Sequence, residues 1–291
     1  QMDLERERGI TIKLQPVRMH YTVAGVEYEL NLIDTPGHVD FSYEVSRSLA
    51  AVEGAILLVD ATKGVQAQTL ANLHLAQAQG LVIVPAVNKV DMVNARTAQV
   101  KEELAYLLGV EESEILEISG KTGHNVPVLL ERVVERVPAP ASVFSDTWTR
   151  AVIFDSTFDA YKGVMAFIRV VSGKLRTHDR IMAWAEKAQA DVLEVGYFAP
   201  KLVEARELHA GQIGYIATGL KDPGRIRVGD TITLAGTDRA SFSPLPGYRQ
   251  LHPMVFASFF PQNSEQYDEL RDALGKLKLT DAALQYEPES S

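Results

Sequence analysis

Two short polar segments, each directly after an apolar run, carry the residues of this chain that can do chemistry. One is Asn88-Lys89-Val90-Asp91, which follows the apolar residues 81–87. A carboxylate such as that of Asp91 can accept two hydrogen bonds from the N1–H and the 2-amino group of guanine. Adenine offers no such donor pair, and each charge-assisted bond contributes roughly 1.5–3 kcal/mol. Lys89 can lay its alkyl stem along the base. The alternative is a polar loop between a strand and a helix, and the place after a buried strand favours guanine binding.

The other segment is Asp34-Thr35-Pro36-Gly37, which fits the pattern Asp-x-x-Gly. Asp34 can hold the water shell of a Mg²⁺ ion, and the small Gly37 lets its backbone N–H approach a γ-phosphate. Taken alone, the segment is also compatible with a turn that begins a helix. Upstream, in Arg8-Gly9-Ile10-Thr11-Ile12, Thr11 can offer its hydroxyl to the same metal ion; the alternative there is the β-branched start of a strand.

Two further groups draw their meaning from position. His38 directly follows Asp-x-x-Gly, where a side chain can orient the water that attacks a γ-phosphate. A lone histidine is more often an ordinary loop residue, so only this context favours catalysis. Ser119-Gly120-Lys121 follows the last apolar run of this region, and its backbone N–H groups can reach guanine O6. Three common residues are a weak signal without that placement.

The elements that must position these groups are strands alternating with helices. Period-two alternation predicts a strand over residues 26–34, and apolar runs predict buried strands at 55–59, 81–87 and 115–118. Helical spacing of apolar residues predicts helices between them, with Gly109 ending one and Asn125 capping another that has Pro127 near its start. This alternation indicates βαβ units and a mostly parallel sheet. Asp34, Asn88 and Ser119 each follow a strand, so we expect them at the carboxyl edge where nucleotides bind.

After Pro138-Ala139-Pro140, which is typical of a linker, the pattern changes. Short β-rich runs at 152–158, 164–171, 180–185, 213–218 and 231–234 predict a β-barrel or sandwich. A further strand at 255–260 and a helix around 270–277, capped by Ser264, predict a third unit that is too short to be complete.

The composition allows a substantial core and excludes several classes of protein. The 291 residues suggest two domains or slightly more, 46% of them are hydrophobic, and the net charge is −9. This charge argues against a generally basic nucleic-acid-binding surface. The chain has no cysteine, no apolar run near the roughly 20 residues of a membrane span, and too polar a start for a signal peptide. We therefore expect a cytosolic protein.

At these residues the chain resembles the translational GTPases, and within them the LepA family, also called elongation factor 4. The group as a whole is indicated by residues 8–12 together with 34–41, and the family by phrases outside the shared motifs. These phrases are residues 2–8, 41–49, 66–72, 270–277 and 286–291.

The resemblance implies an α/β P-loop GTPase-type domain with a parallel sheet over residues 1–138, lacking its first strand and phosphate loop. It also implies a β-barrel domain II over 148–238 and the start of an α+β ferredoxin-like domain III over 250–291. The implied activity is hydrolysis of GTP to GDP with Mg²⁺. Ile10 would form an apolar gate, Thr11 would act as the switch threonine and His38 would act in catalysis.

The resemblance further implies a ribosomal partner, met through domain II and the switch regions, and a role in back-translocation or ribosome assembly. It implies a cytoplasmic protein with peripheral membrane contact and no obligate oligomer. The chain departs from the family in having no Gly-x-x-x-x-Gly-Lys-Ser/Thr loop, so we expect it to bind GTP poorly and to be inactive on its own. A mild departure is Gly120, where the family has alanine.

Two alternatives remain at this point. One is another translational GTPase, such as a relative of elongation factor G, against which the late phrases argue. The other is a non-catalytic ribosome-binding module that has lost its nucleotide site. A decayed site has no chemical need for Asp34, His38, Asn88 and Asp91 together, which argues against the module.

Overall fold

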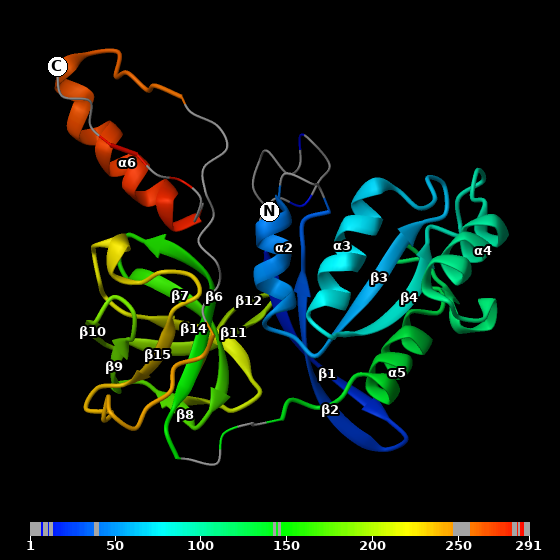
Figure 1. Cartoon of the computed structure of the whole chain (residues 1–291), viewed down its shortest axis with the longest axis horizontal. Coiled ribbons are helices and arrows are strands. Elements are labelled where there is room, and N and C mark those ends of the chain that lie inside the picture. Colours follow the sequence, from blue (N-terminus) through cyan, green and yellow to red (C-terminus); the bar gives the residue numbers. More distant parts are fainter. Residues whose placement is uncertain are drawn as a thin grey trace. The chain divides into compact units, whose positions relative to one another are not determined.

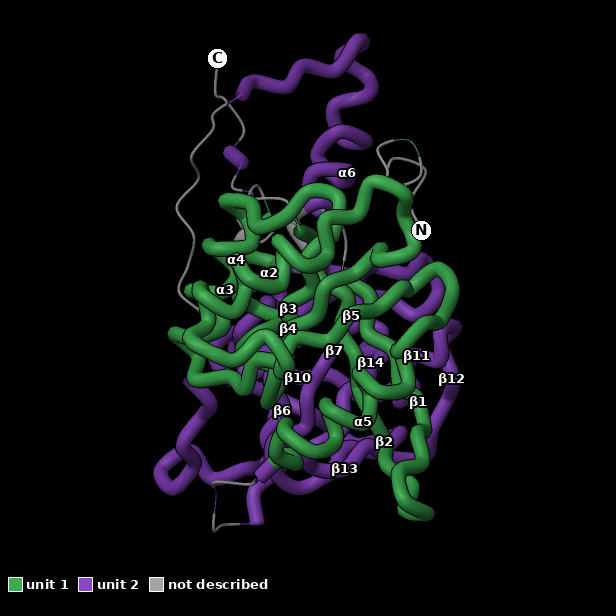
Figure 2. Tube along the Cα trace, turned by 90° about the vertical axis from the view of Figure 1, so that its right-hand side faces the viewer, with its two compact units in different colours: residues 1–140 green, residues 141–291 purple. Residues whose placement is uncertain are grey.

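The computed structural model describes residues 7, 11, 14–37, 41–141, 144, 147–246, 257–280, 284 and 286–287. The contacts within the chain divide it into two compact units, residues 1–140 and 141–291, coloured separately in Figure 2. The division falls directly after Pro138-Ala139-Pro140.

The first unit begins with an antiparallel hairpin of β1 (Gln15–Val23) and β2 (Val26–Asp34). Its two-residue turn consists of Ala24 and Gly25, both at positive φ (49° and 81°), as short hairpins require. Strand β2 confirms the strand predicted over residues 26–34, but its burial does not alternate, because Val26, Tyr28 and Leu32 of the apolar set are exposed. The partner strand β1 was not predicted, although Val17, Met19 and Tyr21 alternate with polar residues in the same way.

A three-stranded parallel sheet follows, in the order β3-β4-β5, with helices between its strands (Figure 1). This confirms the predicted βαβ arrangement. The element bounds are β3 Gly54–Asp60, β4 Val82–Asn88, β5 Leu116–Glu117, α2 Ser42–Leu49, α3 Ala67–Ala78, α4 Thr97–Leu108, the 3₁₀ turn η2 Glu112–Glu114, and α5 Val126–Arg136.

Helices cover both faces of this sheet, which explains the unbroken apolar run of β4. Val84 and Ala86 pack with Leu129 of α5, whereas Val87 packs with Leu104 of α4 on the other face. The expected full burial of residues 55–59 of β3 is wrong: only Val59 is buried, Ala55, Ile56 and Leu57 are half-buried, and the side chain of Leu58 is 50% exposed. In the described part of the chain, β3 is an edge strand that pairs with β4 alone.

The predicted helix ends are confirmed in position but not all in mechanism. Gly109 ends α4 in the left-handed conformation (φ 67°), and Pro127 lies in the first turn of α5. Asn125 does occupy the N-cap position of α5, yet its side chain does not cap the helix. Its amide Nδ2 donates instead to the carbonyl oxygen of Glu117 at 2.9 Å, which ties the helix start to β5.

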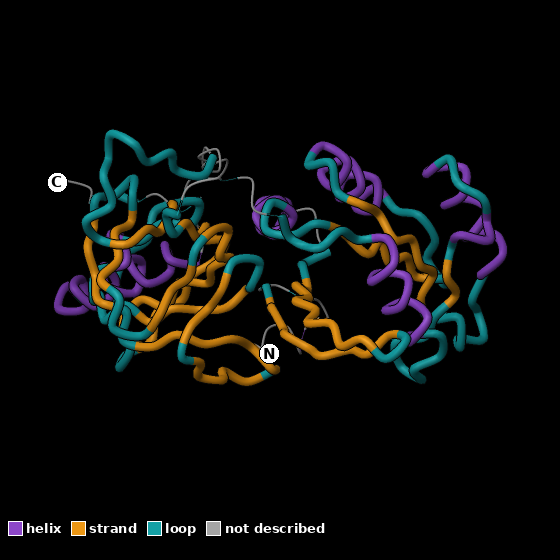
Figure 3. The backbone as a smooth tube through the Cα atoms, turned by 90° about the horizontal axis from the view of Figure 1, so that it is seen from below, coloured by secondary structure: helices purple, strands orange, loops and turns teal. Residues whose placement is uncertain are grey.

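The second unit is rich in strands, drawn in orange in Figure 3, which lie within residues 150–234 and pair antiparallel. An eight-stranded sheet in the order β10-β9-β15-β6-β7-β14-β11-β12 surrounds one apolar core, beside a two-stranded sheet of β13 and β8. The strands are β6 Arg150–Asp159, β7 Gly163–Ser172, β8 Lys174–Arg176, β9 Arg180–Ala183, β10 Ala188–Asp191, β11 Glu194–Ala199, β12 Lys201–Ala205, β13 Glu207–His209, β14 Ile213–Ala217 and β15 Thr231–Leu234, with a 3₁₀ turn η3 at Pro223–Arg225.

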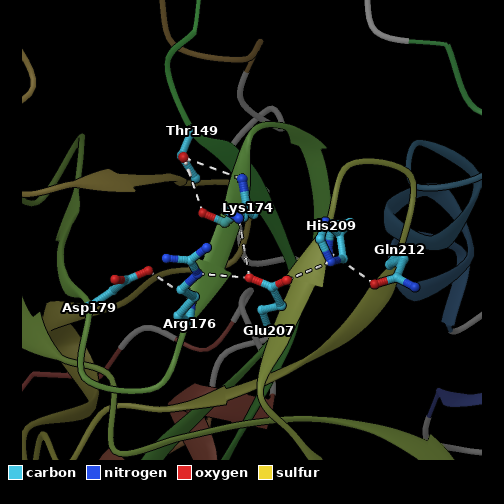
Figure 4. A network of polar contacts seen from close by, with 7 residues as sticks. All are labelled: Thr149, Lys174, Arg176, Asp179, Glu207, His209 and Gln212. Atoms are coloured by element: carbon cyan, nitrogen blue, oxygen red, sulfur yellow. Dashed lines mark hydrogen bonds and ion pairs between the residues drawn. The ribbon is translucent and has the colours of Figure 1, made fainter.

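The predicted β-rich runs correspond to β6, β7, β9, β14 and β15, which carry long or fully buried apolar stretches. The remaining strands were not predicted, because they are short or mix charged with apolar residues. Two of these, β8 and β13, are joined by a network of polar side chains (Figure 4). At its centre Glu207 accepts from Arg176 at 2.7 Å and pairs with Lys174 and His209.

The last described helix is α6, Tyr267–Thr280, which contacts β6 and η3. Ser264 was expected to cap it, but Ser264 is the first residue of a 3₁₀ turn, η4 (Ser264–Gln266), and Asn263 occupies the N-cap position of that turn. The expected strand at 255–260 is wrong for residues 257–260, which form no ladder; the two before them lie outside the described residues. Within the described chain, no helix has the length and apolarity to cross a membrane.

Candidate functional site

The carboxyl edge of the parallel sheet collects the polar residues of the first unit. In the register of β3 and β4, Asp60 lies directly beside Asn88. Ser119 follows β5 at the same edge and is fully buried. Strand ends of a parallel sheet thus bring residues about 30 positions apart in sequence into one site.

Asn88 fastens two loops of this edge together through one side-chain oxygen. Its Oδ1 accepts from the backbone N–H of Lys89 at 2.8 Å and from the backbone N–H of Gly120 at 3.0 Å. The first bond accompanies a left-handed backbone at Lys89 (φ 65°), which is uncommon for a residue with a side chain. The second bond holds the loop after β5 against the loop after β4 at the edge where the sequence placed both Asn88 and Ser119.

Asp91 and Ser119 form the next pair across the same two loops. The side chain of Ser119 hydrogen-bonds the Asp91 carboxylate and lowers its pKa, with a smaller contribution from the nearby charge of Lys121. Ser119 is held in turn, because its Oγ accepts from the backbone N–H of Thr122 at 3.1 Å. The neighbours of this pair are bonded as well: Val90, directly before Asp91, donates its backbone N–H to the carbonyl of Ile118, directly before Ser119, at 3.4 Å. Asp91 is exposed and ionised, so its oxygens can accept bonds from a ligand.

Asp60 belongs to this edge although the sequence analysis did not single it out. Its Oδ2 accepts from Lys89 Nζ at 2.8 Å, and its Oδ1 accepts from the backbone N–H and the hydroxyl of Thr62 at 2.8 and 2.7 Å. Burial alone raises the pKa of Asp60, but these hydrogen bonds outweigh it and bring the pKa to about 2. The available signal was a polar residue that ends an apolar strand, as in the other two cases.

A second group lies where β2 ends. The Thr11 hydroxyl is 3.4 Å from Asp34 Oδ2, so the structure brings together the two side chains that the sequence assigned to a metal ion. A hydroxyl and a carboxylate are hard oxygen donors, which suit Mg²⁺. Gly37 is exposed, with nothing within 4 Å of the place where a Cβ would stand. His38 and Ile10 lie outside the described residues.

The arrangement at the carboxyl edge can bind the edge and one face of a flat heterocycle. Asp91 offers two acceptor oxygens and Lys89 offers an alkyl stem. The loop of residues 119–121 offers the backbone N–H of Lys121, because the N–H groups of Ser119 and Gly120 already donate to the His124 carbonyl and to Asn88 Oδ1. The donor and acceptor pattern matches the groups of guanine that the sequence analysis named.

Family comparisons agree with this reading of both units. The family described as "Elongation factor Tu GTP binding domain" matches residues 1–139, and "Elongation factor Tu domain 2" matches residues 163–233. The first match spans nearly the whole first unit, and the second match lies within the strand-rich part of the second unit.

Curated proteins similar to the chain are described as elongation factor 4. That of Prochlorococcus marinus (strain MIT 9313) is 52% identical over 291 residues, which is 100% of this chain and 48% of the relative. That of Synechococcus sp. (strain CC9605) is 53% identical, also with 48% of its length covered. That of Bifidobacterium animalis subsp. lactis (strain AD011) is 51% identical, with 46% covered. The chain thus spans about half the length of these relatives.

Solved structures show the same fold at low sequence identity. A protein from Thermus thermophilus superposes with a TM-score of 0.73 at 19% identity, over 98% of this chain and 55% of that one. A bacterial selenocysteine-specific elongation factor superposes with a TM-score of 0.66 at 19% identity, over 81% of this chain and 40% of that one. The arrangement of elements therefore has counterparts of known structure.

Proposed function

We propose that this chain belongs to the elongation factor 4 family and is part of a ribosome-associated translational GTPase that binds GTP and hydrolyses it to GDP. The proposed role lies in translation, either in back-translocation or in ribosome assembly. The observation that carries the proposal is the side chain of Asn88, which joins the loops bearing Asp91 and Gly120 at one strand edge.

The nucleotide would be recognised at its base by the loops after β4 and β5. Asp91 would accept from guanine N1–H and the 2-amino group, and the loop of residues 119–121 would donate to O6. The bond from Ser119 and the lowered pKa of Asp91 support this assignment, because an ionised acceptor makes the stronger bonds.

Thr11 and Asp34 would hold the Mg²⁺ ion that accompanies the phosphates, and their 3.4 Å contact supports this. Gly37 would place its N–H near the γ-phosphate. We assign to His38 the orientation of the attacking water and to Ile10 an apolar gate beside it, on the ground of their positions in the sequence.

We further propose that residues 1–138 form the GTP-binding domain, 148–238 the barrel domain and 250–291 the beginning of an α+β domain. The barrel and the switch regions would meet ribosomal RNA and ribosomal proteins. The protein would be cytoplasmic, without an obligate oligomer, and its peripheral membrane contact remains a prediction.

The first experiment tests base recognition in the chain extended upstream with a phosphate-binding loop. Asp91→Asn replaces one acceptor oxygen with a donor, so GDP affinity should fall by about tenfold or more, whereas affinity for xanthosine diphosphate should rise. Competition binding against a fluorescent GDP analogue measures both. A chain that binds neither nucleotide would instead support a ribosome-binding module without a nucleotide site.

The second experiment separates catalysis from binding. In the same extended chain, His38→Ala should lower ribosome-stimulated turnover far more than it lowers GTP affinity. Single-turnover hydrolysis and equilibrium binding on the same preparations provide the comparison. Equal losses in the two quantities would remove His38 from the catalytic role.

A further inference from the structure

The ion pair between Asp60 and Lys89 is the feature of this edge that the motifs do not account for. We propose that Asp60 is a positioning residue, which holds Lys89 so that its alkyl stem forms a fixed wall for the face of the guanine base. This inference rests on the proposed function, since it names how the same site gains affinity.

The carboxylate of Asp60 is itself firmly held. One oxygen accepts two bonds from Thr62, at 2.8 Å from the backbone N–H and 2.7 Å from the hydroxyl. The other oxygen then faces Lys89 Nζ at 2.8 Å. The register of β3 and β4 sets this distance, because Asp60 and Asn88 are neighbours across the ladder. Asp60 therefore presents a fixed acceptor oxygen beside Asn88, the residue directly before Lys89.

Lys89 is restrained both at its backbone and at the end of its side chain. Its backbone N–H is bound by Asn88 Oδ1 at 2.8 Å, and its ammonium is bound by Asp60 across the gap between the two strand ends. The side chain is nevertheless 53% exposed, so packing against the protein restrains it little. A free lysine side chain loses rotamer entropy when it is ordered. Because the ion pair already orders the side chain in the free protein, part of this entropy is lost before the nucleotide binds. The binding step itself then costs less entropy, which is preorganisation.

Asp60 and Asp91 should therefore affect different properties of binding. Asp91 reads the edge of the base and decides which purine is accepted. Asp60 acts through an alkyl stem that lies against the ring face, and every purine has such a face. Loss of Asp60 should weaken guanine and hypoxanthine nucleotides by the same factor, with the ratio of their affinities unchanged.

The test measures GDP and IDP affinities and GDP dissociation rates in the extended chain described above, for Asp60→Ala, Lys89→Ala and the double variant. Asp60→Ala should weaken both nucleotides about tenfold, mainly through faster dissociation. It should cost nothing further on the Lys89→Ala background, since it acts through Lys89. Asp60→Asn, which can still accept from Lys89, should recover most of the loss.

Glu114→Ala is the matched control. It removes an ion pair of similar length, between Arg136 Nη2 and Glu114 Oε2 at 2.7 Å. Glu114 directly precedes the start of β5, so this pair lies at the opposite end of the strand from the site. Its GDP affinity should equal that of the parent chain. Thermal melting of every variant shows which of them keep the parent fold.

Two results would overturn the inference. Asp60→Ala could leave GDP affinity unchanged, or it could lower it by the same factor with and without Lys89, which would indicate a general structural role. In either case the parent chain still binds GDP, so the proposed function survives. If the parent chain binds no guanine nucleotide, the proposed function fails and this inference fails with it.

Discussion

At the scale of single residues, a few polar side chains hold the base-recognition loops by bonding backbone groups. Asn88 and Ser119 each bind an N–H group of the loop after β5, and Ser119 also steadies Asp91. The stability of the loops and the ionised state of the Asp91 carboxylate thus depend on some of the same atoms. Substitutions here should change binding even where they touch no ligand.

Gly120, which departs from the alanine typical of the family, should tolerate that alanine. Its φ is not in the left-handed region, and an added Cβ would meet only Asn88 Oδ1 and Nδ2, at 3.8 and 3.9 Å. We expect Gly120→Ala to change GDP affinity by less than about twofold, since these are ordinary van der Waals contacts. Isothermal titration of the extended chain measures this.

Gly123 in the same loop is the matched comparison. It has open space around it but lies at φ 81°, where an alanine is strained. Gly123→Ala should lower the free energy of unfolding by about 1 kcal/mol or more. If Gly120→Ala lowered the free energy of unfolding more than Gly123→Ala does, the backbone conformation assigned to this loop would be wrong.

At the scale of elements, the ends of β3 and β4 are pinned by a charge pair as well as by the ladder. Asp60 is ionised well below its ordinary pKa of 3.8, and its side chain is 19% exposed. A carboxyl group whose pKa is depressed in the folded state stabilises that state above its unfolded pKa. The stabilisation is lost as the pH falls through the folded pKa.

The pH dependence of stability should therefore carry a contribution from Asp60. Relative to Asp60→Asn, the parent chain should gain about 1 kcal/mol near pH 6, and the gain should disappear between about pH 4 and pH 2. Urea unfolding of both proteins across this range gives the difference. A difference that stays constant with pH would mean that ionisation of Asp60 is not its source.

The barrel contains a second charged element, a column of stacked cations and rings. Arg150, at the start of β6, is fully buried between Phe144 and Phe242, whose ring centroids lie 4.0 and 4.6 Å from its guanidinium carbon. Its Nε donates to the carbonyl of Ser243 at 2.8 Å. The ring of Phe242 also contacts that of Trp184, with the two centroids 4.5 Å apart and the planes tilted by 41°. The column fixes the segment after β15 onto the sheet.

Arg150→Ala should lower the free energy of unfolding of the second unit by about 3 kcal/mol, since it removes a desolvated cation–π pair and charged hydrogen bonds. Urea unfolding followed by tryptophan fluorescence measures this, because Trp184 belongs to the column. Arg239, which caps Trp184 at 4.4 Å on the exposed end, serves as the control. Arg239→Ala should cost less than about 1 kcal/mol, and equal effects would show that burial is not decisive.

At the scale of the whole molecule, each unit has its own apolar core, the first in layers on the parallel sheet and the second inside the antiparallel one. In the described part of the first unit, the hairpin and the parallel sheet share no ladder. The 291 residues also contain no phosphate-binding loop of the Gly-x-x-x-x-Gly-Lys-Ser/Thr pattern.

We therefore expect the 291-residue chain alone to bind GDP weakly, with a dissociation constant above the micromolar range, because phosphates are held chiefly by backbone N–H groups of such a loop. Adding a strand and loop upstream should restore tight binding, as titration with a fluorescent GDP analogue would show. Micromolar binding by the unextended chain would mean that the base-recognition loops suffice.

From β2 onward, the sequence by itself determined the order of strands and helices in the first unit, because burial on two faces leaves unbroken apolar runs such as that of β4. It also placed Asp34, Asn88 and Ser119 at strand ends, because each ends or directly follows a run of residues whose pattern alone predicts a strand. For the second unit it predicted the long buried strands but not β10 or β12, whose ladders come from partners outside their own short segments.

Only the tertiary structure decided which of these groups meet. The role of Asp60 depends on the register of β3 against β4, and no local pattern specifies a register between strands separated by a helix. The same holds for Asn125, which the local sequence marked as a helix cap but which bonds β5 instead. Local signals report what a residue can bind, whereas packing selects its partner from several that are chemically equivalent.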